Sequence, residues 1–277
     1  MSEIMTDRSD EALTWAIEEN FFKFVSLLKQ YPKAEVHDDL ELLWTITDIP
    51  FFLFNVQMRA RLLPEVVEPE IRSAIERGQS HKVPICWYVS QTTKPVDLWN
   101  HLEKHGFIAE EPEIGMAIDF SLINQSLPVA PDLRIERVEN REMLQTWCHT
   151  ASSGFDMPAF VGEAFHDIFL FLGLSKLSPV HHYIGYLNGE PVATSTLYPG
   201  AGVAGIYDVS TLPEARRQGI GAAMTIQALQ DARQMGYQVG ILQASQMGLP
   251  VYKRIGFKEY CKINLYIKEP HTNMTIP

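Results

Sequence analysis

The second half of the chain shows a strand, a short loop and a helix in succession. From Val203, apolar residues run into an alternation of polar and apolar positions over residues 207–211, which predicts a strand with one face buried. Apolar residues then recur at steps of three and four from Ile220 to Met235, which predicts a helix with one apolar face. A further apolar run at 239–244 predicts a second buried strand. The hydrophobic pattern therefore indicates an α/β arrangement.

Similar signals precede this unit. Residues 133–138 predict a strand, and Asn140 is suited to cap the helix that follows it. Strands predicted over 182–187 and 192–198 are joined by Asn188-Gly189-Glu190, and Asn-Gly is typical of a tight hairpin. The second half therefore contains enough elements for a complete sheet flanked by helices.

The loop before the long helix reads Arg216-Arg217-Gln218-Gly219-Ile220-Gly221-Ala222. The backbone N–H groups at a helix N-terminus have no partner inside the helix, and they are suited to bind a phosphate or pyrophosphate. The nucleotide-triphosphate loop needs Lys and then Ser or Thr after its last glycine, and the dinucleotide fingerprint needs a third glycine. Here Ala222-Ala223 follow the last glycine, and position 224 is Met, so neither motif fits. An ordinary tight turn is the alternative to a phosphate loop.

A second motif follows about thirty residues after this loop. Residues 252–257 read Tyr-Lys-Arg-Ile-Gly-Phe. Together, Arg-x-x-Gly-x-Gly and Tyr-x-x-x-Gly-Phe resemble the GNAT superfamily of acetyl-CoA-dependent N-acetyltransferases. The resemblance covers residues 133–268, about half of the chain. It implies an α/β (α+β) fold in which a mixed, mostly antiparallel twisted sheet is flanked by helices.

The resemblance implies roles for particular residues. Backbone amides of the loop would hold the pyrophosphate of coenzyme A, and the end of the preceding strand would pair with the pantetheine arm. Tyr252 has the position of the general acid that protonates the departing thiolate. Asp208 is the best candidate for the base that receives the proton of the amine, directly or through water. The expected coenzyme-binding residues are Val209, Ser210, Thr211, Arg216, Arg217, Gln218, Gly219, Ile220, Gly221, Ala222 and Ser245.

Three of these residues have alternative interpretations. Tyr252 remains protonated at neutral pH and can donate a proton, but its ring could instead pack beneath the coenzyme. Asp208 could be a hydrogen-bonded residue that shapes its strand, on which alternation places it on the same face as Ser210 and opposite Tyr207. Many members of the family carry Asn where this chain has Ser245, so the role of that position stays open.

The first half of the chain repeats the second in weaker form. Residues 102–107 read Leu-Glu-Lys-His-Gly-Phe and parallel residues 252–257 at an offset of 150 positions. Strand-like runs at 83–89 and 114–120 match those at 239–244 and 263–268. The repetition predicts a tandem protein with two copies of one fold.

The first copy is predicted to lack a coenzyme site. Its corresponding loop region, residues 61–70, contains no glycine, and Leu102 stands where the second copy has its tyrosine. Pro69 at the expected helix start removes a backbone N–H, and three glutamates of this region would repel a pyrophosphate. A structural role, or one wall of the acceptor cleft, is expected instead. The predicted organisation is a degenerate domain at 1–123, a linker at 124–132, a catalytic domain at 133–268 and a disordered tail at 269–277.

Composition agrees with a two-domain cytoplasmic protein. The chain has 277 residues, of which 46% are hydrophobic. It begins without the features of a signal peptide and has no apolar run that could span a bilayer. Cys86, Cys148 and Cys261 are scattered, so we interpret them as core residues. His181 and His182 point to opposite faces of an extended chain and are interpreted as strand-edge residues, so no metal site is expected. The net charge of −11 disfavours nucleic acid as a partner.

These observations predict an acyltransferase. It would move an acetyl group from acetyl-CoA to a primary amine of a small molecule or peptide by direct attack, without a metal. The Phe-rich segment 155–174 is expected to cover the acceptor site, and the acidic charge mildly favours a cationic acceptor. The alternative is a non-catalytic acyl-CoA-binding sensor or assembly module, against which Tyr252 argues because a binder needs no acid.

Overall fold

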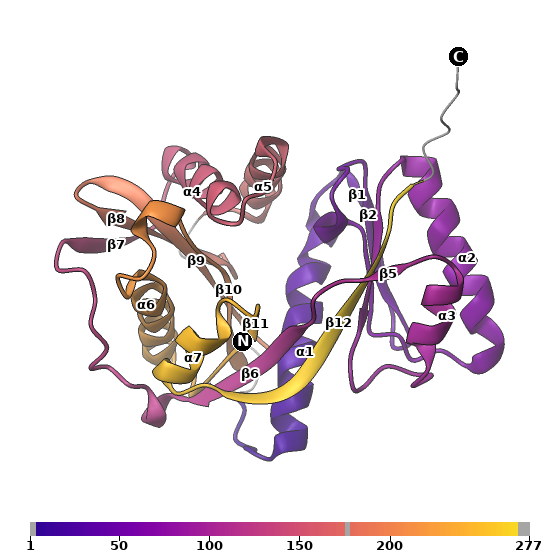
Figure 1. The fold of residues 1–277 in the computed structure, drawn as a ribbon, viewed down its shortest axis with the longest axis horizontal. Helices are drawn as coiled ribbons and strands as arrows, with labels where there is room; N and C mark the ends of the chain where they lie inside the picture. Colours follow the sequence, from indigo (N-terminus) through magenta and orange to yellow (C-terminus); the bar gives the residue numbers. More distant parts are fainter. Residues whose placement is uncertain (1–3, 175–177, 271–277) are drawn as a thin grey trace. The chain divides into compact units, whose positions relative to one another are not determined.

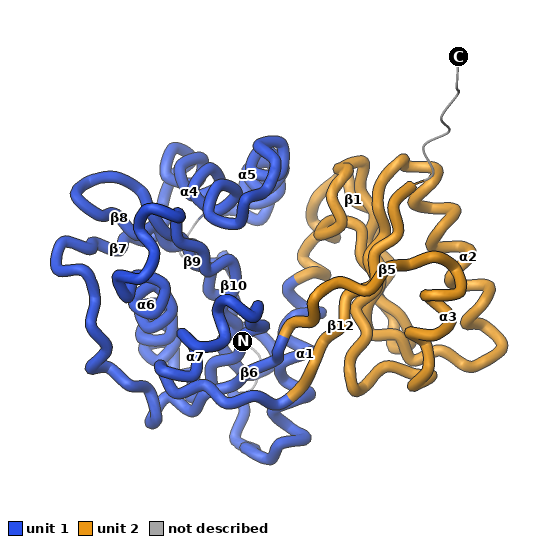
Figure 2. The backbone as a smooth tube through the Cα atoms, in the orientation of Figure 1, with its two compact units in different colours: residues 1–24, 114–260 blue, residues 25–113, 261–277 orange. Residues whose placement is uncertain are grey.

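The structure is a computed structural model that describes residues 4–174 and 178–270. The chain forms two compact units, drawn in different colours in Figure 2. Unit 1 contains Met1–Phe24 and Ile114–Tyr260, and unit 2 contains Val25–Glu113 and Cys261–Pro277. The predicted linker at 124–132 thus lies wholly within unit 1. Most of the predicted tail, residues 271–277, lies outside the described residues.

Unit 1 is built on a mixed sheet with the strand order β6-β11-β10-β9-β8-β7 (Figure 1). Neighbouring strands are antiparallel except β10 and β11, which are parallel. The hairpin between β8 and β9 has positive φ at both Asn188 and Gly189, as its sequence predicts. The strands are β6 (Glu113–Asp119), β7 (Leu133–Arg137), β8 (His181–Leu187), β9 (Glu190–Gly200), β10 (Val203–Thr211) and β11 (Val239–Ala244).

Helices cover both faces of this sheet. Trp147 packs against His182 of β8, whereas the next residue of that strand, Tyr183, donates a hydrogen bond to Asp231. Successive side chains of a strand point to opposite faces, so the helices that carry Trp147 and Asp231, α4 and α6, lie on opposite sides. The helices of unit 1 are α1 (Asp10–Ser26), α4 (Arg141–Gly154), α5 (Ala159–Leu172), α6 (Ile220–Gln234) and α7 (Leu249–Ile255), with 3₁₀ turns η3 (Phe120–Leu122) and η4 (Pro213–Ala215).

Helix α1 lies in unit 1 up to Phe24, and its side chains contact β9 and β10. Asn20 is fully buried, and its amide nitrogen donates to the carbonyls of Gly200 at 2.8 Å and Tyr198 at 3.3 Å. Its amide oxygen accepts a 2.6 Å hydrogen bond from the hydroxyl of Tyr207, whose ring stacks on Phe24. These polar contacts tie α1 to the hairpin that leads into β10.

Replacing Asn20 with leucine is expected to destabilise the protein by about 3 kcal/mol, because it leaves buried carbonyls and a hydroxyl without partners. The measurement is urea denaturation of both proteins, with Gln125→Leu at an exposed position as the control. Equal midpoints for the Asn20 variant and the parent would show that this contact does not stabilise unit 1.

In unit 2 the strands follow the order β1-β2-β3-β4-β12, with the short strand β5 paired to β12. Helix α2 begins at Pro64, so the predicted start at Pro69 is wrong, since Pro69 lies inside the helix. Pro64 fits the first turn because an N–H there has no acceptor within the helix. The elements are η1 (Leu27–Gln30), β1 (Ala34–Asp38), β2 (Leu43–Thr47), η2 (Phe52–Phe54), β3 (Val56–Met58), α2 (Pro64–His81), β4 (Ile85–Val89), α3 (Leu98–Lys104), β5 (Ile108–Ala109) and β12 (Lys258–Lys268).

The two units repeat the same order of elements. The order β3-α2-β4-α3 in unit 2 matches β10-α6-β11-α7 in unit 1, and β3 and β4 are parallel like β10 and β11. The strand that follows each copy pairs with the sheet of the other copy. Strand β6 comes after α3 of the first copy in the chain but pairs with β11. Strand β12 comes after α7 of the second copy but pairs with β4. This exchange is why the compact units differ from the boundaries predicted at residues 123 and 133.

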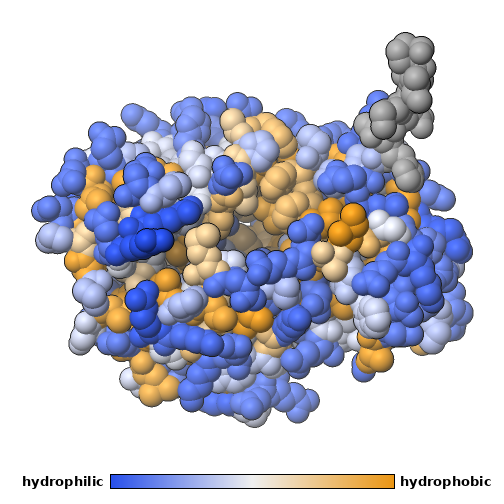
Figure 3. Space-filling model, in the orientation of Figure 1, coloured by the Kyte–Doolittle hydropathy of each residue, from blue (hydrophilic) through white to orange (hydrophobic). Residues whose placement is uncertain are grey.

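On the face shown in Figure 3, hydrophilic residues cover most of each unit. Within the residues that the structure describes, no helix combines the length and the apolar character needed to cross a membrane. The three cysteines are buried and free, as predicted for core residues.

Candidate functional site

The parallel strands β10 and β11 separate soon after they begin. Their pairing covers only Ala204 with Gly240 and Gly205 with Ile241. Further along, Ser210 and Thr211 remain paired with β9 on the other side. The edge of β10 that faces β11 is therefore unpaired from residue 207 onward among the described strands. Such an edge can bind an extended ligand as an added strand.

The loop between β10 and α6 ends in the first turn of the helix, where several backbone amides are exposed to a possible ligand. Gly219 is the N-cap and has φ +77°, a conformation that favours glycine. Within the described chain, the backbone amides of residues 217–222 donate no hydrogen bonds. The side chain of Arg216 donates to the carbonyls of Thr211 and Gly154, each at 3.0 Å, so it braces the loop. Arg217 therefore offers the guanidinium that the loop can present to a ligand.

A cavity of about 450 Å³ lies beside this loop. Gln218, Gly219 and Arg217 form one side of it, and Arg254 at the end of α7 contributes a second guanidinium. The other side is formed by the predicted linker. The lining residues are Leu127, Pro128, Val129, Ala130, Arg217, Gln218, Gly219, Ala222 and Arg254. Arg254 and the four linker residues are not among the site residues that the sequence predicts, and the signal for Arg254 is its place within the Tyr-x-x-x-Gly-Phe motif.

Asp208 lies at a β-bulge in β10, between Tyr207 and Ser210. Its φ of +51° is a left-handed conformation, so the simple alternation predicted for this part of the strand is wrong. The Oδ2 atom is buried and has no hydrogen-bond partner in the described chain. Burial raises the pKa of Asp208 to about 6, an effect that a hydrogen bond from Thr196 partly offsets. A buried carboxylate on a strained backbone is typical of a functional position.

Tyr252 lies in α7, whose ends at Pro250 and Gly256 agree with the sequence signals. Its side chain is 8% exposed, and its ring packs edge-on against Phe257 at a centroid distance of 5.9 Å. The hydroxyl makes no hydrogen bond within the described residues, and burial raises the pKa of Tyr252 well above its usual value. The hydroxyl is therefore protonated at neutral pH and available to a ligand.

Ser245 follows β11, as expected, and is exposed. Its hydroxyl accepts a 3.2 Å hydrogen bond from the backbone N–H of Gly248, and its carbonyl accepts one from Leu249. The side chain thus helps to form the turn into α7. A role beside the pantetheine arm stays a prediction.

His181 and His182 have different partners. The imidazole of His181 contacts the guanidinium of Arg137, whereas Nδ1 of His182 lies 2.9 Å from the hydroxyl of Thr196. Both are buried in a strand that lies between two others, so the interpretation as strand-edge residues is wrong. Burial lowers the pKa of His182 to about 3, so its ring is neutral. Among the described residues no cluster has the composition and geometry to hold a metal ion.

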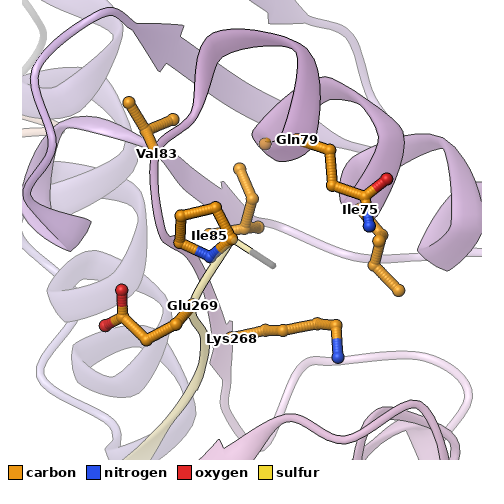
Figure 4. A pocket seen from close by; sticks show the side chains of 8 residues that line it. Ile75, Gln79, Val83, Ile85, Lys268 and Glu269 are labelled. Carbon is orange, nitrogen blue, oxygen red and sulfur yellow. The ribbon is translucent and has the colours of Figure 1, made fainter. Parts of the chain in front are cut away.

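The corresponding region of unit 2 is closed. After β3, the carbonyl of Ala60 accepts a hydrogen bond from Lys94 at 2.8 Å, and Leu62 donates to the Lys94 carbonyl at 3.0 Å. Leu102, in place of a tyrosine, is fully buried. Away from this region, at the C-terminal end of α2, a cavity between α2, β4 and the end of β12 has about 10 Å³, room for about one water molecule (Figure 4). That the first copy has no coenzyme site stays a prediction.

Comparison with known proteins agrees with this geometry. The model of the acetyltransferase (GNAT) family matches residues 143–257. A GCN5-related N-acetyltransferase from Kribbella flavida is 16% identical, with a TM-score of 0.68 over 92% of this chain and 97% of that one. A GCN5-related N-acetyltransferase from Sphaerobacter thermophilus is 14% identical, with a TM-score of 0.63 over 96% of this chain and 94% of that one.

A tandem GNAT protein from the clavulanic acid biosynthesis pathway has a TM-score of 0.59 at 10% identity, over 98% of each chain. At these identities, the structural likeness concerns the fold alone. Residues 143–257 match the model of the acetyltransferase (GNAT) family, and over its whole length the chain has a fold like that of a tandem GNAT protein.

Proposed function

We propose that the protein transfers an acetyl group from acetyl-CoA to a primary amine by direct attack. The observation that carries this proposal is the open edge of β10 beside the unpartnered amides of residues 217–222. An extended pantetheine arm needs backbone partners, and a pyrophosphate needs several N–H donors. The family typically uses acetyl-CoA, and both requirements are met on one end of the same strand.

The chemistry requires few protein groups. The amine nitrogen attacks the thioester carbonyl and loses a proton, the carbon–sulfur bond breaks, and the departing thiolate takes up a proton. Asp208, with a pKa of about 6, is deprotonated at neutral pH and can receive the amine proton directly or through water. Tyr252 keeps its proton and can give it to the thiolate. The acidic charge of the chain, −11, favours a cationic small molecule or peptide as acceptor in the cytoplasm.

Replacing Gly221 with glutamate is expected to abolish micromolar binding of acetyl-CoA. A Cβ at Gly221 meets only Thr211 Oγ1, at 3.7 Å, so the side chain fits while its charge repels a pyrophosphate. At Gly219, a Cβ would lie 2.0 Å from the carbonyl oxygen of Pro128, so a substitution there also disturbs the backbone. The measurement is calorimetric titration of acetyl-CoA, with exposed Gln234→Glu at the other end of α6 as the control.

Three results would contradict the proposal. Absence of binding to the parent protein would mean that the glycine-containing loop is only a turn. Binding that survives in the Gly221 variant would place the coenzyme elsewhere. Binding without turnover of any amine in an acceptor screen would support the alternative function, a non-catalytic acyl-CoA-binding protein.

A further inference from the structure

A row of residues crosses the neighbouring strands β8, β9 and β10 on the face of the sheet that α4 covers (Figure 1). His182 of β8 lies opposite Thr196 of β9, and Thr196 lies opposite Tyr207 of β10, so their side chains share this face. The ring of His182 packs on Trp147 of α4 at a centroid distance of 4.5 Å. Thr196 and His182 are both buried. Their polar atoms therefore need partners within the protein.

The β-bulge in β10 brings the carboxyl of Asp208 to the same face. In a regular strand, the residue after Tyr207 would point to the opposite face, away from Thr196. At the bulge, Asp208 has a positive φ, and Thr196 donates a hydrogen bond to its carboxyl. Within the described residues, Oδ2 of Asp208 has no partner, so this hydrogen bond goes to Oδ1. The bulge therefore leaves one carboxyl oxygen available to a ligand.

The imidazole of His182 decides which way the hydroxyl of Thr196 points. The Nδ1 atom of His182 lies 2.9 Å from Oγ1 of Thr196. A hydroxyl has one proton, so when Thr196 donates to Asp208, the proton between Nδ1 and Oγ1 belongs to His182. Burial against Trp147 and Phe169 lowers the pKa of this imidazole to about 3, so it is neutral and has a single N–H. A chain of hydrogen bonds thus runs from His182 through Thr196 to Asp208.

The charged and titratable groups around this chain of hydrogen bonds favour the same arrangement. Arg137 of β7 and the neighbouring His181 lower the pKa of the imidazole further, which keeps it neutral. The thiol of Cys148 in α4 lies near Asp208 and stays protonated, because burial and the carboxylate raise its pKa. Among the described residues, the pKa of Asp208 is raised by burial and lowered by Thr196. Thr196 is therefore the contact that stabilises the charged form of this carboxyl.

We infer that Thr196 and His182 are positioning residues for the carboxylate that receives the proton of the amine. The inference rests on the proposed function, in which Asp208 is the base. His182 holds the hydroxyl of Thr196 toward Oδ1, so Oδ2 is the oxygen that takes up the proton when the amine nitrogen attacks the thioester. Neither Thr196 nor His182 gives up its own proton. The pair orients the base and stabilises its charge.

The hydroxyl is tested by its removal. Thr196→Val is expected to raise the pKa of Asp208 by about one pH unit or more, because the hydrogen bond stabilises the carboxylate. The midpoint of the pH profile of kcat/KM should rise by the same amount. Thr196→Ser, which keeps the hydroxyl, should change neither value. Thr150→Val, at another buried threonine whose hydroxyl donates to the carbonyl of Thr146, is the matched control and should also change neither.

The imidazole is tested by two substitutions. His182→Leu removes the donor, so both values should rise by about 0.3 pH units or more. His182→Asn should restore the values of the parent, because its side-chain amide can replace the Nδ1–H. Carbon-13 NMR of the carboxyl, assigned by comparison with Asp208→Asn, measures the pKa without any substrate. Thermal denaturation checks that each variant folds.

The two measurements separate this inference from the proposed function. If the folded Thr196→Val or His182→Leu protein keeps the pKa and the pH profile of the parent, the inference is wrong while the proposed function stands. An equal shift in Thr196→Ser would also overturn the inference, because the hydroxyl would then not be its cause. If the NMR shifts appear but the parent acetylates no amine in an acceptor screen, the proposed function is wrong, and with it the role of the pair.

Discussion

Replacing Tyr252 with phenylalanine is expected to lower kcat for acetyl transfer by about 100-fold or more while leaving the affinity for coenzyme A unchanged. A positioned general acid contributes about 10²–10⁴-fold to such a reaction. The substitution removes only the hydroxyl, which makes no hydrogen bond within the described residues, and it keeps the ring that packs on Phe257. The fold should therefore tolerate the change, and the loss should be confined to the chemical step.

The measurement is steady-state turnover of an amine found in an acceptor screen, together with calorimetry of coenzyme A. Tyr186→Phe, at a half-buried position in β8 whose ring contacts Arg134, is the matched control and should leave kcat unchanged. An unchanged kcat for the Tyr252 variant would mean that the ring only packs beneath the coenzyme. Loss of affinity without loss of kcat would lead to the same conclusion.

The local signals in the sequence predict most of the elements of unit 1 because each depends on residues close together in the chain. The cap at Asn140 is confirmed by a 2.9 Å hydrogen bond from the N–H of Met143 to its side chain. The left-handed residues at Asn188 and Gly256 close a hairpin and end a helix as expected. The Phe-rich segment 155–174 contains a helix, α5, and its role over the acceptor site stays a prediction.

Features that depend on distant parts of the chain could not be predicted in this way. The apolar run at 114–120 identifies a strand, but the exchange that pairs β6 with β11 depends on which edge is free in the folded unit. The bulge at Asp208 has no sequence signal, since polar and apolar residues still alternate through it. The predicted linker lacks periodicity, so only its contacts with Gln218 and Arg254 place it at the site.

Asp208→Asn is expected to lower activity and raise stability at neutral pH. Burial raises the pKa of Asp208 from its usual 3.8 to about 6, so the folded protein binds this proton more tightly than the unfolded chain does. The difference in proton binding therefore leaves the folded state fully stable at pH values below 3.8, the usual pKa. This stability is lost as the pH rises through about 6 and the buried carboxyl loses its proton. The charged form costs the folded protein up to about 3 kcal/mol at pH 7. Asparagine removes that charge and tolerates the positive φ of this position.

The same carboxylate must be deprotonated to act as a base. In the parent, kcat/KM is therefore expected to fall as pH is lowered through about 6, and the Asn variant should lose this dependence together with about 100-fold or more in kcat. Chemical denaturation at pH 4 and pH 7.5 should show a stability gain for the variant at the higher pH, and exposed Asp132→Asn should change neither property. A stability gain with full activity would mean that water alone receives the proton. Loss of both stability and activity would identify Asp208 as a residue that shapes the bulge. A stability gain together with loss of activity would identify it as the base, because a carboxylate that is costly to bury is retained where the reaction requires its charge.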